Sequence, residues 1–204
     1  MDLLPDEKRL FKRLSTASRI QDYLDSIPIN HEYDGETLLS PREVIRQKHA
    51  HCIEAALLAV AVFRFHKKKA YLLDLKTTGL PEDYDHVVAL FKEKGCWGAI
   101  SKTNHSVLRY RDPVYKSVRE LVMSYFHEYF IVSGKKTLRS YSRPFQLPRS
   151  PWWITTSENL WQIAEALDAS HHIQLVTPSQ IKMLRKASVF ERTESVRTEW
   201  KARK

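Results

Sequence analysis

The sequence predicts an α+β fold in which a central helix packs on a small antiparallel sheet. Residues 52–65 are apolar on nearly every side, which is typical of a helix surrounded by protein. Residues 70–75, 86–92 and 96–102 are short runs typical of strands, and Lys94 with Gly95 marks a turn that joins the last two as an antiparallel hairpin. Amphipathic helical patterns lie before and after this region, so we expect further helices around the sheet.

The N-terminal region carries apolar residues at approximately helical spacing between residues 6 and 25. This pattern predicts one amphipathic helix, which Ile27 and Pro28 end. Residues 29–39 contain Asn, Asp and Gly and are expected to form a loop.

A second helix is expected to begin at about residue 41. Ser40 can cap it, Pro41 suits its first position, and Glu43 can complete a capping box. Two continuations are open: the helix runs unbroken to Phe65, or it ends and another helix begins at Cys52. Only in the second case does Cys52 lie at a helix N-terminus.

The C-terminal half predicts three helices and one extended segment. Residues 116–130 have an amphipathic pattern, a helix begins near Ser157 and ends near Ala169, and Thr177 is the expected cap of another. Residues 143–157 hold three prolines and two adjacent tryptophans, so we expect an extended segment packed over the core.

Length and charge indicate one domain with a basic appendage. A chain of 204 residues with 43% hydrophobic content can bury one substantial core, which we assign to residues 1–180. The net charge is +9, and residues 182–204 hold eight basic against three acidic side chains. Residues 181–204 are therefore expected to form a solvated basic helix or tail, and no motif for specific nucleic-acid binding accompanies them.

Cysteine content and hydropathy indicate the compartment. The chain has two cysteines, no secretory signal, and no apolar run of about 18 residues that could span a membrane. We therefore expect a cytoplasmic protein with free thiols and without a membrane partner. The sequence contains no signal for its oligomeric state.

Cys52 is the strongest candidate for chemistry. A helix that begins at this residue would favour a thiolate through its positive dipole end, and its unpaired N–H groups would hold an oxyanion. His86 opens a later strand that can pack beside this helix, and it is the expected base. Gln47 is a candidate additional donor to the oxyanion.

A catalytic histidine is commonly oriented by a third polar group. In the predicted hairpin, Ser101 and Asn104 lie beside the position opposite His86, where cross-strand Cβ atoms are about 5 Å apart. Asn104 has the better spacing for the third member of the site. Asp112 has the better chemistry for stabilising an imidazolium, but the chain would have to fold back to bring it near.

Several short motifs occur in a recognisable order within residues 40–115. They are Ser40–Val44, Cys52 with Ala55 and Ala56, the strand at 70–75, His86 with Val87, Gly95–Trp97, and Asp112 with Pro113. In this order they resemble the transglutaminase-like superfamily of papain-fold cysteine enzymes. The resemblance implies a papain-like α+β core, with Cys52 as nucleophile and His86 as base.

The expected function is a thiol-dependent acyl-transfer enzyme of the cysteine protease, amidase or transglutaminase type, which acts on an amide or peptide bond without a cofactor. The alternative is an inactive papain-fold domain that binds a partner through its basic C-terminus and tryptophan segment. A metal site is not expected, because His49, His51 and Cys52 form one cluster without the second pair of ligands that a structural zinc ion requires.

Overall fold

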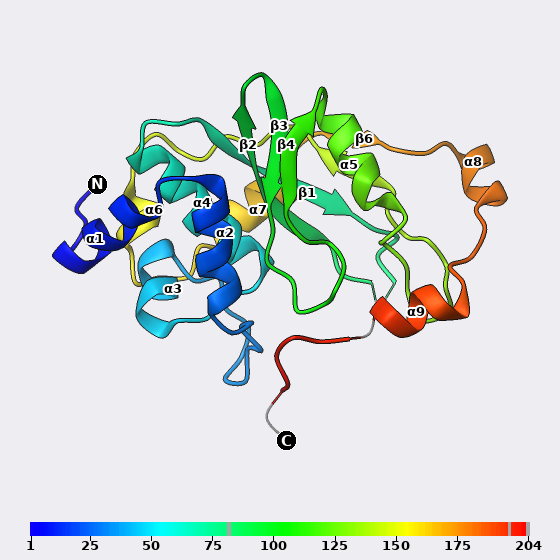
Figure 1. Ribbon diagram of the computed structural model, residues 1–204, viewed down its shortest axis with the longest axis horizontal. Helices are drawn as coiled ribbons and strands as arrows, with labels where there is room; N and C mark the ends of the chain where they lie inside the picture. The colour runs from blue at the N-terminus through cyan, green and yellow to red at the C-terminus, as the bar shows by residue number, and fades with distance from the viewer. Residues whose placement is uncertain (81–82, 196, 203–204) are drawn as a thin grey trace.

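The computed structural model describes residues 1–80, 83–195 and 197–202 as helices packed on both faces of one sheet (Figure 1). The helices are α1 (Pro5–Arg13), α2 (Ala17–Ser26), α3 (Pro41–Gln47), α4 (Cys52–Phe65), α5 (Val118–Phe126), α6 (Trp152–Thr155), α7 (Trp161–Asp168), α8 (Pro178–Met183) and α9 (Val189–Ser195). The strands are β1 (Ala70–Lys76), β2 (His86–Glu93), β3 (Cys96–Ile100), β4 (Arg111–Tyr115), β5 (Ser140–Ser142) and β6 (His172–Gln174). This architecture agrees with the expected α+β class.

The sheet has the strand order β4-β3-β2-β1-β5-β6, and each neighbouring pair is antiparallel. The predicted hairpin is confirmed, because Glu93 pairs with Cys96 across Lys94 and Gly95. Both turn residues have positive φ angles, 46° and 84°, which match a tight two-residue turn to the twist of the strands. Strands β4, β5 and β6 were not expected from the sequence.

Side chains of the central strands alternate between two hydrophobic clusters. Val87, Ala89 and Phe91 of β2 pack with α4. Val88 and Leu90 point to the other face and pack with α5. The sheet is therefore buried on both faces, which explains why β2 reads as a continuous apolar run rather than as an alternating one.

The chain breaks between α3 and α4. Helix α3 ends at Lys48, which adopts the left-handed conformation with φ of 57° and donates its N–H to the carbonyl of Val44. The linker then forms a short parallel bridge between Ala50 and Ile29. A new helix starts at Cys52, so the second of the two continuations considered above is confirmed.

The N-terminal region differs from the prediction. The single helix expected over residues 6–25 is two helices, because the chain turns at Leu14 and restarts with Thr16 as a cap. The Thr16 hydroxyl accepts a hydrogen bond from the N–H of Arg19 at 3.2 Å. The apolar spacing continues across this break, which is why periodicity alone did not reveal it.

The C-terminal half also differs in its helix bounds. Helix α5 begins two residues after the expected start, since Ser117 caps it by accepting from the N–H of Glu120. The prediction of a wholly extended segment over residues 143–157 was wrong at α6, where Trp153 is fully buried. Helix α7 begins at Trp161 rather than at Ser157, and Thr177 caps α8 as predicted. Among the described residues, no helix is long and apolar enough to cross a membrane.

Gly98 offers a test of the packing between β2 and β3. A Cβ atom at this position would lie 2.5 Å from Cζ of Phe91 and 2.8 Å from the carbonyl oxygen of Arg111. Gly98→Ala should lower the free energy of unfolding by about 1–3 kcal/mol in urea denaturation, because neither the ring nor the backbone can move without disturbing the core. Glu93→Ala, at an exposed position of β2, should change it by less than about 0.5 kcal/mol. Equal effects of the two variants would contradict this account.

Candidate functional site

The N-terminus of α4 and the start of β2 meet at a cleft of about 960 Å³. Its walls include His51 and Cys52 from the start of α4, His86 from β2, Asn104 from the loop after β3, and Tyr129 from the segment after α5. The cleft therefore brings together the predicted nucleophile and the predicted base.

Cys52 occupies the first position of the 14-residue helix α4 and is a free, partly buried thiol. Burial alone raises the pKa of this thiol, but hydrogen bonds to His51 and His86 and the charges of these two rings lower it well below its usual range. The positive end of the helix dipole acts in the same direction. The site is therefore built to hold a thiolate, which is the nucleophilic form of cysteine.

His86 is buried, and the hydroxyl of Ser101 fixes its ring. Nε2 lies 2.8 Å from Oγ of Ser101, and this hydroxyl donates its own proton to the carbonyl oxygen of Leu108. Ser101 must therefore accept from Nε2–H, which leaves Nδ1 for the interaction with Cys52. Buried Gln21 holds Ser101 in turn, since its side chain bonds both the N–H and the carbonyl of that residue.

In the described contacts, neither residue predicted as the third member is hydrogen-bonded to His86. Asn104 lines the cleft, but its side chain donates to the carbonyl oxygen of Trp200 at 2.9 Å and accepts from the N–H of Trp200 at 2.8 Å. Asp112 is exposed on β4, two strands away from β2. Ser101, which the sequence argument weighed beside Asn104, is the residue hydrogen-bonded to His86.

The predicted oxyanion donor Gln47 also lies outside the cleft wall. Its amide belongs to α3 and donates to the carboxylate of Glu43 at 3.0 Å. The start of α4 offers a better donor, because the first N–H groups of a helix have no acceptor within the helix. The backbone N–H of Cys52 is such a group and lies beside its own sulfur.

His51 has a role that the sequence did not reveal. Its Nε2 lies 3.0 Å from the carbonyl oxygen of Thr37 and 3.3 Å from Oε1 of Glu54. A carbonyl can only accept, so Nε2 carries a proton and Nδ1 is left for Cys52. Burial lowers the pKa of His51, but Cys52, Glu54 and the Thr37 carbonyl together raise it to about 9. The available signal was Glu54, three residues after His51, where an acid completes a capping box.

The C-terminal segment forms one wall of the cleft. Val189, Arg192 and Thr193 of α9 line it. The segment is fixed at one end by Arg192, which donates to the carbonyl of Val132 at 2.9 Å, and at the other by the contacts of Trp200 with Asn104. Of the described residues in this basic segment, those of α8 and α9 form helices without buried side chains, and Arg192 and Trp200 attach the segment to the domain.

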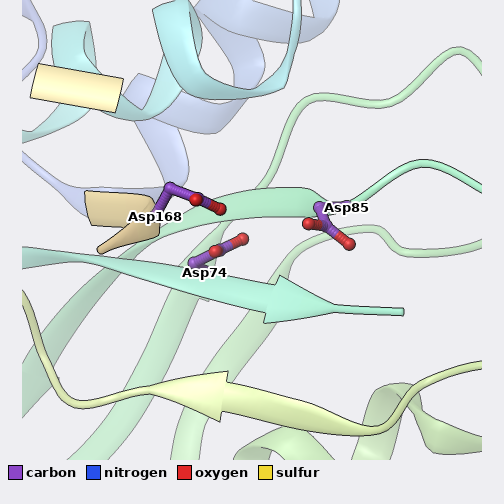
Figure 2. A group of neighbouring side chains, drawn as sticks. All are labelled: Asp74, Asp85 and Asp168. Carbon is purple, nitrogen blue, oxygen red and sulfur yellow. The ribbon is translucent and has the colours of Figure 1, made fainter. Parts of the chain in front are cut away.

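A cluster of carboxylates lies close to the site. Figure 2 shows Asp74 of β1, Asp85 before β2 and Asp168 at the end of α7 turned toward one another, with oxygen atoms within 4.8 Å. Each carboxylate has a partner, because Asp74 pairs with His172 at 3.0 Å, Asp85 accepts from Thr77, and Asp168 pairs with Lys76. Among the described residues, these oxygens are the best placed to bind a cation. Their hydrogen bonds and ion pairs already join β1, α7 and the loop before β2.

Comparisons of the sequence with known proteins found no match. No protein-family model matches the sequence, and the search of curated proteins found no matching relative.

The low pKa of the Cys52 thiol gives a measurable pH dependence. In a Cys96→Ser background, the rate of alkylation by iodoacetamide should follow the thiolate fraction and reach half its plateau well below the pH of about 8.5 at which a free cysteine titrates. Mass spectrometry locates the label and gives the rate at each pH. A midpoint at or above pH 8.5 would contradict the described contacts of the thiol.

The cleft wall formed by the C-terminal segment should loosen when Asn104 loses its amide. Asn104→Ala removes two hydrogen bonds to Trp200, each contributing about 1 kcal/mol. Together the two bonds contribute about 2 kcal/mol, so hydrogen exchange of residues 197–202 should become roughly 30-fold faster, because about 1.4 kcal/mol changes an opening equilibrium tenfold. Ser179→Ala, at an exposed position outside both anchors, should leave this exchange unchanged. Equal protection in the two variants would show that other contacts hold the wall.

Proposed function

We propose that this protein is a thiol-dependent acyl-transfer enzyme that acts on an amide or peptide bond. The observation that carries the proposal is the placement of Cys52 at the start of α4 in the cleft that His86 also lines, with the His86 ring fixed by Ser101. A nucleophile, a base and a group that orients the base are the parts such a reaction needs. We further propose that the core is papain-like, as the resemblance to the transglutaminase-like superfamily implies.

The proposed reaction begins with attack of the Cys52 thiolate on the substrate carbonyl carbon. The new C–S bond pushes the carbonyl electrons onto oxygen, and the N–H of Cys52 at the helix start stabilises this oxyanion. The C–N bond then breaks, and protonated His86 gives its Nδ1 proton to the leaving amine. Neutral His86 next accepts a proton from the second substrate, which attacks the thioester and restores the thiolate.

The second substrate decides the type of enzyme. Water makes the protein a protease or amidase, and a primary amine makes it a transglutaminase. Neither route requires a cofactor or a nucleic-acid partner. The two cysteines are free thiols, which supports our proposal of a reducing, cytoplasmic setting.

Site variants test the enzyme proposal against a peptide–aminocoumarin library for hydrolysis and against glutamine peptides with dansylcadaverine for transfer. Cys52→Ala should abolish turnover, and His86→Gln should lower kcat/KM by about 10²–10⁴-fold, because it removes proton transfer. Ser101→Ala should lower it by roughly 10-fold, since the ring loses its orientation but not its chemistry. Cys96→Ser is the matched control and should retain full activity.

The opposite result has a definite meaning. If the parent protein turns over neither probe and a peptide acyloxymethyl ketone leaves no adduct on Cys52, the domain is a binding module rather than an enzyme. Trp153 of the tryptophan segment is buried in the core, whereas Trp152 of the same segment is 38% exposed and is available to a partner.

A further inference from the structure

Cys52 contacts two histidines, and their surroundings differ in charge. His86 has a neutral partner, the Ser101 hydroxyl. His51 has the carbonyl of Thr37 and the carboxylate of Glu54 at its Nε2. A hydroxyl that accepts from a histidine fixes the ring, whereas a carboxylate at 3.3 Å also stabilises its positive charge.

The contacts of Glu54 show that this carboxylate is built into the fold. Its side chain is fully buried, and it accepts from the N–H of Leu39 at 2.8 Å, the N–H of His51 at 2.9 Å and the hydroxyl of Thr37 at 2.9 Å. A buried carboxylate with this many donors is held in one place. His51 is itself only 21% exposed, so its charge acts on Cys52 through little solvent.

We infer that His51 is a second catalytic residue, an imidazolium held by Glu54 and the Thr37 carbonyl that keeps Cys52 as a thiolate while His86 alone moves protons. This inference rests on the proposed function and assigns separate roles to the two rings. His51 keeps both of its protons throughout the reaction. His86 loses its Nδ1 proton to the leaving amine and regains one from the second substrate.

The charges of the four groups balance in both states of this cycle. Before attack, the thiolate and Glu54 are negative while His51 and His86 are positive. In the acyl-enzyme, the thioester and His86 are neutral, and His51 and Glu54 remain as an ion pair. The buried site thus never holds an uncompensated charge, which would be costly in a partly desolvated cleft.

Other titratable groups face the same site and bear on any pH measurement. Glu32 lies 3.8 Å from Nε2 of His51. Buried Tyr129 faces the cleft from the segment after α5, and its pKa is raised well above 10 by burial first and then by the charges of Cys52, Asp85 and neighbouring carboxylates. Lys102 and Arg192 also line the cleft, but the groups that lower the pKa of the thiol are His51 and His86.

The test measures the pH dependence of iodoacetamide alkylation of Cys52 in a Cys96→Ser background. His51→Gln should raise the midpoint by at least one pH unit, which is a tenfold loss of thiolate at a given pH on the rising limb. His51→Lys keeps a positive charge near Glu54 and should recover at least half of that shift. His49→Gln, two residues earlier and outside the cleft lining, is the matched control and should leave the midpoint unchanged.

A spectroscopic measurement covers the case in which the His51 variants fail to fold. In the parent protein, imidazole ¹⁵N shifts should show His51 doubly protonated at pH 7.5, and in Cys52→Ala its titration midpoint should fall because the thiolate is gone. A neutral His51 ring at pH 7.5, or folded His51→Gln with an unchanged alkylation midpoint, would overturn the inference. If the parent protein shows no amide turnover but its ¹⁵N shifts are as expected, the proposed function is overturned. The ion pair of His51 and Glu54 would still stand.

Discussion

The site depends on one buried carboxylate, that of Glu54. It accepts hydrogen bonds from the backbone of Leu39 and His51 and from the side chains of Thr37 and Asn30. It therefore attaches the loop over residues 30–39 to the first turn of α4, and the position of Cys52 follows from that attachment. An amide in its place would leave several of these donors without acceptors, at a cost of about 1–3 kcal/mol for each buried group.

The two histidines beside Cys52 illustrate how one residue type acquires different properties from its surroundings. Both rings use Nε2 for an orienting contact, so Nδ1 is the ring nitrogen that remains for Cys52. The contact to His51 comes from the loop that Glu54 organises. The contact to His86 comes from Ser101, and the side chain of Gln21 in α2 is hydrogen-bonded to the backbone of Ser101. Helix α2 thus supports the site through a hydrogen-bond chain although it contributes no residue to the chemistry.

The sequence was sufficient to predict the hairpin and the helix that begins at Pro41, because these features are local or depend on simple strand pairing. It also singled out Cys52 and His86 as candidates, but it left open whether a new helix begins at Cys52. It was not sufficient to find the role of His51, since that role depends on a loop whose fold Glu54 determines. The preference for Ser101 over Asn104 depends on the last described residues, which engage Asn104 through Trp200, 96 positions away along the chain. Contacts at such separation leave no periodic signal in the sequence.

The alternation along β2 has a consequence for how this region tolerates insertions and deletions. Val88 and Leu90 face the α5 side, and His86 has the same parity on the strand. A slip of one residue against β1 or β3 would turn all three to the opposite face together. An error that displaced the proposed base would therefore also exchange side chains between the two hydrophobic clusters and disrupt their packing. Correct pairing of the hydrophobic strands therefore also sets the position of His86. A chain with His86 on the opposite face would lack the native packing of β2.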